Sequence, residues 1–246
     1  MQRALISVLL PLFFLTSFAF AEALPFANLW SGFSTSLQGR SPEQRHNAEL
    51  ASRYIDGYII APGSIFSFNE LVGGRDRTKG YEAAPFLNGD GLLEDTPGGG
   101  ICQLASTIYN AGLLGGLEVA ERHPHSRTVQ HVPPGRDATI ASWRKDLKLR
   151  NPFTHPLMVR INSGDNRLTV SLRSAKEKDF SVTIFTVQAV LDPHAVAANP
   201  KSKGQTGMRG FATTTWRVTK RMGVEQKELL SEDTYPPPSR IMAGGE

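Results

Sequence analysis

Two stretches of the chain place hydrophobic side chains at helical intervals. In the first, Ala48, Ala51 and Ile55 recur three and four residues apart, which puts them on one face of a helix. Residues 41–44, Ser-Pro-Glu-Gln, precede this stretch and combine a serine N-cap, a proline at the first helical position and a glutamine three residues after the cap. The pattern predicts a helix that begins with this proline and ends near Gly57.

The second helical pattern begins directly after three glycines and covers residues 101–116. Its apolar positions fall at intervals of three, four and seven residues from Ile101. Cys102 lies about 110° from the centre of that stripe, since successive residues turn by about 100°. It shares this other face with Ser106 and Tyr109. A purely structural cysteine would more often lie within the apolar stripe.

The second half of the chain is patterned as strands. Asn162-Ser163-Gly164-Asp165-Asn166 has the composition of a hairpin turn, and a second hairpin is expected around Met222-Gly223. The expected fold class is therefore α+β, with two main helices packed on antiparallel β-strands and a C-terminal β-hairpin extension. The predicted strands are 65–68, 128–132, 138–143, 157–161, 168–173, 180–187, 211–219 and 224–230.

Residues 72–100 lie between the helices and are rich in glycine. They are expected to form a long loop region with a short strand near Ala84–Leu87. Loops of this length inside compact domains are usually functional. The segment that leads into Cys102 is therefore a candidate part of a site.

The first 21 residues have the pattern of an export signal. Arg3 precedes an apolar run from Ala4 to Phe20, which Pro11 interrupts, and small residues occupy both positions of an Ala-x-Ala cleavage site that ends at Ala21. The run is also near the minimum length for an uncleaved membrane anchor. The proline and the cleavage site favour a cleaved signal, and we expect a periplasmic or other extracytoplasmic location.

Composition narrows the classes of function. The chain has 246 residues, 40% of them hydrophobic, and a net charge of +4, which suits a folded domain rather than a disordered tail or a coiled coil. No arginine-rich strip with interleaved aromatic residues occurs, so we expect no nucleic-acid partner. No membrane span is expected beyond the N-terminal signal.

Cys102 is the only cysteine and cannot form an internal disulfide. An idle thiol is a liability in an oxidising compartment, so an exported chain with one cysteine suggests a thiol with a role. The preceding glycines allow backbone N–H groups to converge on an anion, and the first helical turn adds free N–H groups and a positive dipole end. Such a position favours the thiolate and could hold the oxyanion of an acyl intermediate.

A thiol nucleophile needs a base. His123-Pro124-His125-Ser126 follows the cysteine helix closely enough to fold back on it, and Asp137 could orient an imidazole as the third member of a triad. A metal site is the competing use of these groups, because Cys102 with His123, His125 and His131 could bind zinc. No established zinc motif is present, and we expect no cofactor.

From about Ser34 onward the chain resembles the VanW family, named after an accessory protein of vancomycin-resistance clusters. The Gly-Ile-Cys-Gln sequence of residues 100–103 is the most specific part of the match. The other matching blocks are 45–47, 62–70, 106–111, 121–126, 132–139 and the C-terminal residues 231–235.

The resemblance implies L,D-transpeptidase activity, in which the cysteine forms 3-3 cross-links in peptidoglycan. Cys102 would be the acylated nucleophile and His125 the first choice of base, with His123 and Asp137 as the other catalytic candidates. The expected organisation is a signal peptide (1–21), a VanW-like domain (22–190) and a β-rich extension (191–246). The residues expected to form the oxyanion or substrate site are Gly99, Gly100, Gln103, Ser106, Tyr109, Ser126 and Arg127.

Two functions follow from these observations. One is a cysteine acyltransferase that acts on peptidoglycan or its stem peptides. The alternative is a non-catalytic module that binds cell-wall glycopeptides, in which Cys102 is merely packed.

Overall fold

The structure is a computed structural model that describes residues 26–87, 93–141, 144–192, 195–199, 209–237 and 240–243. The predicted export signal lies outside these residues. Within them, no helix is both long and apolar enough to cross a membrane.

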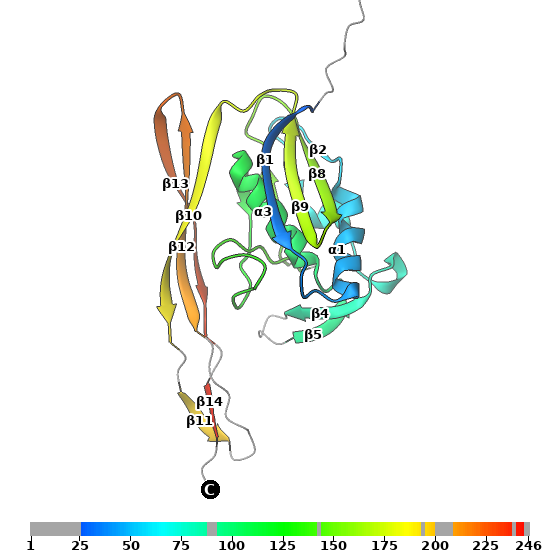
Figure 1. Cartoon of the computed structure of the whole chain (residues 1–246), viewed down its shortest axis with the longest axis vertical. Helices are drawn as coiled ribbons and strands as arrows, with labels where there is room; N and C mark the ends of the chain where they lie inside the picture. Colours follow the sequence, from blue (N-terminus) through cyan, green and yellow to red (C-terminus); the bar gives the residue numbers. More distant parts are fainter. Residues whose placement is uncertain are drawn as a thin grey trace, which may run out of the picture.

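A four-stranded antiparallel sheet forms one wall of the α/β body (Figure 1). The expected hairpin is present, and its turn places Asp165 and Asn166 at positive φ, a conformation that these two residue types tolerate. The strands in spatial order are β1 (Asn28–Ser36), β9 (Arg167–Ser174), β8 (Leu157–Gly164) and β2 (Ile59–Ile60).

The helix α1 (Pro42–Ile55) begins as its sequence predicts. Ser41 and Gln44 form both hydrogen bonds of a capping box, and the helix buries the predicted stripe. A short helix that the patterns did not reveal, α2 (Phe68–Val72), and a 3₁₀ turn, η1 (Arg77–Lys79), follow it.

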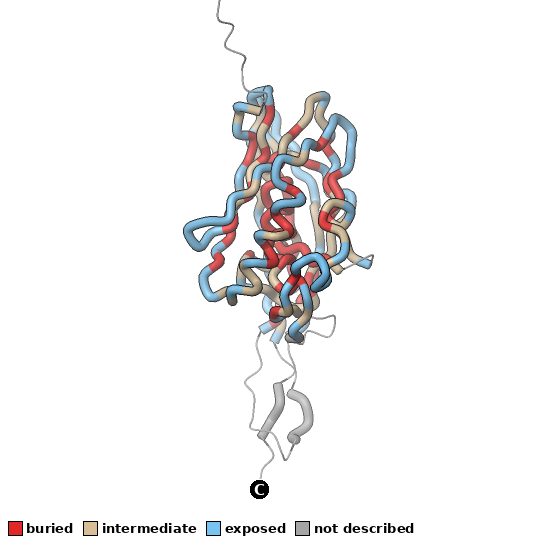
Figure 2. Tube along the Cα trace, turned by 90° about the vertical axis from the view of Figure 1, so that its right-hand side faces the viewer, coloured by how far each residue is buried: buried red, intermediate tan, exposed pale blue. Residues whose placement is uncertain are grey.

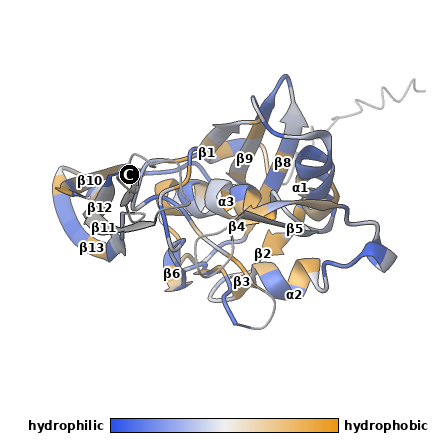
Figure 3. Ribbon diagram, turned by 90° about the horizontal axis from the view of Figure 1, so that it is seen from below, coloured by the Kyte–Doolittle hydropathy of each residue, from blue (hydrophilic) through white to orange (hydrophobic). Residues whose placement is uncertain are grey.

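The helix α3 (Ile101–Gly115) lies at the centre of the molecule and is buried from Ile101 to Leu113. Figure 2 shows that buried residues gather in the middle of the body and that exposed residues lie around its outside. Seen from below, α3 lies between the strands β1, β8 and β9 on one side and smaller strands on the other, with the C-terminal sheet beside it (Figure 3). The close approach to β9 requires a glycine, since a Cβ at Gly115 would lie 2.5 Å from Leu172.

Two small sheets surround the ends of α3. The predicted strand near Ala84–Leu87 is confirmed as one strand of a hairpin, so the segment 72–100 is less irregular than expected. The elements are the hairpin of β4 (Ala83–Leu87) and β5 (Leu93–Pro97), and the sheet of β3 (Ile65–Ser67), β7 (Lys148–Arg150) and β6 (Glu118–Glu121).

Two predicted strands were wrong. Residues 128–132 form no strand, and the described part of 138–143 contains only an isolated bridge between Ala141 and Lys145. The backbone here bonds to the helix and to a neighbouring loop instead: the N–H of Ala138 donates to Ser106 Oγ and that of Thr139 to the His123 carbonyl.

The C-terminal strands form a long antiparallel sheet that stands beside the body (Figure 1). The predicted hairpin around Met222-Gly223 is confirmed, and a third strand pairs along its whole length. The strands are β10 (Phe180–Leu191), β12 (Gly210–Arg221) and β13 (Val224–Tyr235), with β11 (Ala195–Asn199) and β14 (Arg240–Ala243) paired in parallel below them. The fold class is α+β, as the sequence predicts.

Candidate active site

Cys102 is the second residue of α3 and faces the loop that carries His125 and Asp137. Its sulfur lies 3.7 Å from Thr139 Oγ1 and 3.7 Å from the Ile140 carbonyl oxygen. Cys102 and His125 lie close enough that each shifts the pKa of the other. The thiol and the imidazole, 23 positions apart in the sequence, are therefore direct partners.

Asp137 holds the other side of the imidazole. His125 Nδ1 lies 2.6 Å from Asp137 Oδ2, and the backbone N–H of His125 donates to the same oxygen at 2.7 Å. Two donors on one carboxylate oxygen fix the orientation of the ring and leave Nε2 without a bond to Asp137. The order Cys–His–Asp is that of a catalytic triad.

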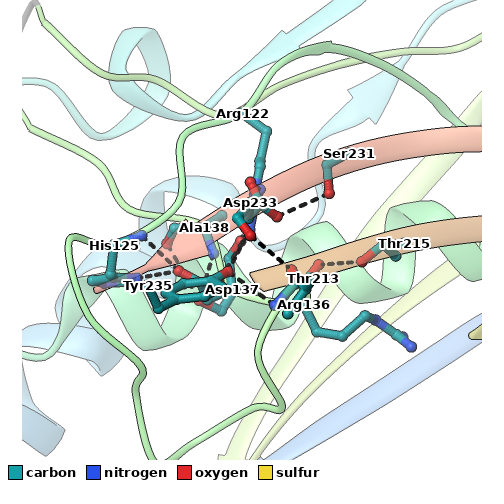
Figure 4. A network of polar contacts seen from close by, with 12 residues as sticks. Arg122, His125, Arg136, Asp137, Ala138, Thr213, Thr215, Ser231, Asp233 and Tyr235 are labelled. Atoms are coloured by element: carbon teal, nitrogen blue, oxygen red, sulfur yellow. Dashed lines mark hydrogen bonds and ion pairs between the residues drawn. The ribbon is translucent and has the colours of Figure 1, made fainter. Parts of the chain in front are cut away.

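A second layer of polar groups holds Asp137 (Figure 4). Arg122 donates to Asp137 Oδ1 at 3.0 Å and to Asp233 Oδ1 at 2.5 Å. The Tyr235 hydroxyl donates to Asp137 Oδ1 at 2.5 Å and accepts the N–H of Gly135 at 2.9 Å. Asp233 and Tyr235 both come from β13, so the C-terminal sheet supplies part of the site.

These contacts set the protonation of the triad. Burial by itself raises the pKa of Cys102, but the hydrogen bond and positive charge of His125 outweigh it and lower that pKa. Burial lowers the pKa of His125, yet Asp137 and Cys102 raise it to about 9. Burial raises the pKa of Asp137, while His125 and Arg122 lower it to about 2. The lowered pKa of Cys102 and the raised pKa of His125 both favour a thiolate beside an imidazolium, the reactive form of a cysteine nucleophile.

The glycines before Cys102 allow close approach of other elements. A Cβ at Gly99 would lie 2.2 Å from the Ala84 carbonyl oxygen, and one at Gly100 would lie 2.6 Å from the Gln44 carbonyl oxygen. Asn47 of α1 donates to the Gly99 carbonyl at 3.0 Å. The segment is therefore fixed between α1 and β4.

Fewer backbone N–H groups than predicted are available to bind an anion near Cys102. The N–H groups of Gly98, Gly99, Ile101 and Gln103 donate to backbone carbonyls. Within the described residues, those of Gly100 and Cys102 have no acceptor. Serine proteases form their oxyanion hole with the same two positions, the nucleophile and the residue two before it.

A groove of about 440 Å³ gives access to the sulfur. Its described lining contains three arginines, Arg40, Arg127 and Arg209, and no Asp or Glu. Such a lining attracts anionic ligands. Cys102, His125 and Gln103 lie along the same groove.

The comparisons with known proteins identify the family of the chain. A family model described as "VanW like protein" matches residues 43–173. The chain belongs to the VanW family. The matched region contains Cys102, His125 and Asp137, whereas β12 and β13 lie beyond it.

Two curated relatives align with this VanW-family chain. It is 38% identical to the uncharacterized protein YoaR of Bacillus subtilis over 143 residues, which cover 58% of this chain and 46% of the relative. It is 30% identical to the vancomycin B-type resistance protein VanW of Enterococcus faecalis over 129 residues, which cover 50% of this chain and 46% of the relative. The alignments thus span about half the length of each relative. No solved structure matches this chain.

His123, the other candidate base, is not directed at the cysteine. Its Nε2 lies 3.0 Å from Glu121 Oε1, and its side chain is about one-third exposed. In the described part of the chain, no three His, Cys, Asp or Glu side chains come together as a metal site requires.

His131 lies near the triad, but its pKa is lowered whereas that of His125 is raised. Arg40 lies 3.2 Å from its Nδ1, and its Nε2 lies 3.0 Å from Ser106 Oγ. Burial, followed by the nearby charges of His125 and Arg40, lowers its pKa to about 3. A neutral His131 fits this position because a second cation would repel the His125 imidazolium.

Of the remaining predicted site residues, some line the groove and others hold the surrounding structure in place. Gln103 and Arg127 line the groove, although both N–H groups of the Gln103 amide already bind Thr35 and Ser36. Ser106 is fully buried and joins α3 to the Ala138 backbone, Tyr109 packs under Arg122, and Ser126 is half-buried next to His125.

Sequence reasoning missed Arg122 and Tyr235 as positioning residues. Arg122 lies within the region that the family model matches, whereas Tyr235 lies beyond it, in the block 231–235 that resembles the family. The resemblance pointed to both blocks, but no local pattern indicated that their side chains meet at Asp137.

Proposed function

We propose that this chain is a cysteine acyltransferase of the L,D-transpeptidase kind that acts on peptidoglycan stem peptides in the cell envelope. The observation that carries the proposal is the buried chain of contacts from Cys102 through His125 to Asp137. A packed structural cysteine needs neither an imidazole partner nor a lowered pKa. The apolar residues 4–20 would direct the chain out of the cytoplasm.

The proposed reaction has two steps. The Cys102 thiolate attacks a carbonyl of the donor peptide, a carbon–sulfur bond forms, and the N–H groups of Gly100 and Cys102 stabilise the oxyanion. The carbon–nitrogen bond then breaks, and the His125 imidazolium gives its proton to the leaving amine. An acceptor amine attacks the thioester, returns a proton to His125 and releases Cys102.

The charge of the groove supports an anionic peptide as substrate. Stem peptides carry carboxylates, and arginine guanidinium groups bind carboxylates through paired hydrogen bonds. Arg40, Arg127 and Arg209 would supply such contacts along the donor.

The test is incubation with muropeptides, followed by mass spectrometry of the intact protein and of the products. We expect an acyl group on Cys102 and a new cross-linked product in the wild type, and neither in Cys102→Ala. Identical product profiles from the two proteins would contradict the proposal. A Cys102 pKa near its ordinary value, with slow alkylation, would instead favour a non-catalytic binding module.

A further inference from the structure

Cys102 borders a second cavity besides the arginine-lined groove. This cavity has a volume of about 210 Å³, and Arg75, Gly98 and Ile140 are part of its lining. Cys102 and Phe86 line both spaces. Pockets for whole small molecules usually exceed about 300 Å³, so this cavity suits a single small residue rather than a length of peptide.

Arg75 is the charged residue of this cavity, and its hydrogen-bonding capacity is largely unused. Its NH2 group donates to Asn69 Oδ1, while its Nε is buried without a partner. Within the described residues, no carboxylate forms an ion pair with it at 4.0 Å or less. A partly buried guanidinium with one neutral acceptor is incompletely satisfied, and a carboxylate is its best-matched ligand.

The position of Arg75 is fixed by its surroundings. Its guanidinium lies over the Phe68 ring, 5.8 Å from the centroid. A Cβ at Gly98 would lie 3.2 Å from the Arg75 Cβ, so the side chain runs directly against the glycine segment before Cys102. Asn69, its acceptor, is itself held by Asp146 and Lys145.

We infer that Arg75 binds the α-carboxylate of the donor's C-terminal residue, the residue that leaves when Cys102 is acylated. This inference rests on the proposed function and names the specificity of the same site. The body of the donor lies in the arginine-lined groove, the scissile carbonyl lies at Cys102, and the leaving residue occupies the second cavity. The released product carries its new amine and the carboxylate that Arg75 held. The enzyme therefore acts at a free carboxyl terminus and releases one residue.

The first experiment compares two donor peptides that differ only at the terminus, a free carboxylate and a carboxamide. The wild type should form the acyl-enzyme about 10- to 100-fold faster with the carboxylate, the range expected for one charge-assisted hydrogen-bonded contact. Arg75→Gln should lose this preference, and Arg75→Lys should keep part of it. Arg77→Gln, which changes an exposed arginine two residues away, is the matched control and should keep it in full.

The second experiment does not depend on acyl transfer. Alanine at millimolar concentration should slow the alkylation of Cys102 by iodoacetamide, and alaninamide should not. Arg75→Gln should abolish the protection by alanine.

The outcomes separate the two proposals. Equal acylation of both donors by the wild type would overturn the role of Arg75 and leave the acyltransferase intact. An equal loss of rate with both donors in Arg75→Gln would also overturn it, because Arg75 would then act on the thiolate. Arg75-dependent protection by alanine without any acyl-enzyme would support the carboxylate site and overturn the proposed reaction.

Discussion

The segment that carries the proposed nucleophile and the segment that carries the proposed base are built in different ways. Cys102 and the two free N–H groups belong to three consecutive residues, 100–102, at the start of α3. His125 and Asp137 lie in a stretch without regular strands, and Tyr235, which bonds Asp137, comes 98 residues later in the chain. The nucleophile and its oxyanion donors are thus a local backbone feature, whereas the base depends on long-range packing.

Because the proposed base depends on long-range packing, the proposed chemistry is expected to depend on the C-terminal sheet. Arg122 joins Asp137 to Asp233, and all three side chains are at most 5% exposed. Removing one partner from such a buried charged group leaves another charge uncompensated. The sheet of β10, β12 and β13 is therefore expected to be part of the working site, although it lies outside the region that the family model matches.

The largest effect is expected from His125→Gln. This change removes the proposed base, which belongs to the part of the site that depends on long-range packing. Without the imidazolium, burial raises the pKa of Cys102, and at pH 7 the thiolate fraction should fall on the order of 100-fold. Acyl transfer should fall by about 10²- to 10⁴-fold. The measurement is the rate of iodoacetamide alkylation between pH 5 and pH 10.

In the wild type, this alkylation rate should fall as the pH drops through the lowered pKa of Cys102, because protonation removes the thiolate. In His125→Gln the same fall should occur at higher pH. Superimposable profiles would show that His125 does not control the thiol.

Gly100→Ala is the corresponding change in residues 100–102, the part of the site that consecutive residues form. The added Cβ meets the Gln44 carbonyl, and the residue has φ +100°, so the backbone must shift and displace an oxyanion donor. Acyl transfer should fall by about 10²- to 10³-fold. Alkylation by a small neutral reagent should change far less, because the contact with His125 remains.

The matched control is Gly57→Ala, where φ is also positive at +82° but nothing lies within 4 Å of the new Cβ. It should lose about 1–2 kcal/mol of stability from the backbone conformation alone and keep its activity. Equal activity in Gly100→Ala and Gly57→Ala would argue against an oxyanion donor at position 100.

A smaller effect is expected from Tyr235→Phe, which removes one hydrogen bond between the C-terminal sheet and Asp137. The Gly135 N–H loses its acceptor, so the free energy of unfolding should fall by about 1–3 kcal/mol. Acyl transfer should fall by roughly one order of magnitude, since His125 and Arg122 still hold the carboxylate.

A merely structural tyrosine would change stability without moving the pH profile of Cys102 alkylation. We expect Tyr235→Phe to move that profile and Tyr54→Phe, at an exposed tyrosine of α1, to leave it unchanged. An unmoved profile in Tyr235→Phe would separate the C-terminal sheet from the chemistry.

The smallest effect is expected from His123→Gln. The side chain contacts Glu121 at a partly exposed position, so stability should change by less than about 1 kcal/mol and acyl transfer by less than about twofold. Kinetics of acyl-enzyme formation check this directly. A loss comparable to that of His125→Gln would make His123 the base.

The amino-acid sequence by itself determined the features that depend on neighbouring residues. The capping box of α1 and the positive-φ turn of the β8–β9 hairpin each close their hydrogen bonds within a few positions. Such patterns are legible in sequence because the same residues both form and satisfy the local structure.

Only the tertiary structure decided which histidine meets the thiol and what the off-stripe face of α3 contacts. The pattern left His123 and His125 as alternatives and placed Cys102 outside the apolar stripe, but α3 is buried on all sides. Because the helix is enclosed, its polar face must find partners from distant loops. Those loops bond to α3 and to one another instead of pairing as the predicted strands 128–132 and 138–143.

Arg75 and Tyr235 follow the same rule. Neither is marked by local spacing, because each acquires its role from packing: Arg75 against Gly98 beside the sulfur, and Tyr235 against Asp137 from the far end of the chain. Burial, Asp137 and the interaction between the two groups themselves shift the pKa values of Cys102 and His125. The sequence pointed to Cys102 as the proposed nucleophile, and the fold alone assembled the groups that would make it reactive.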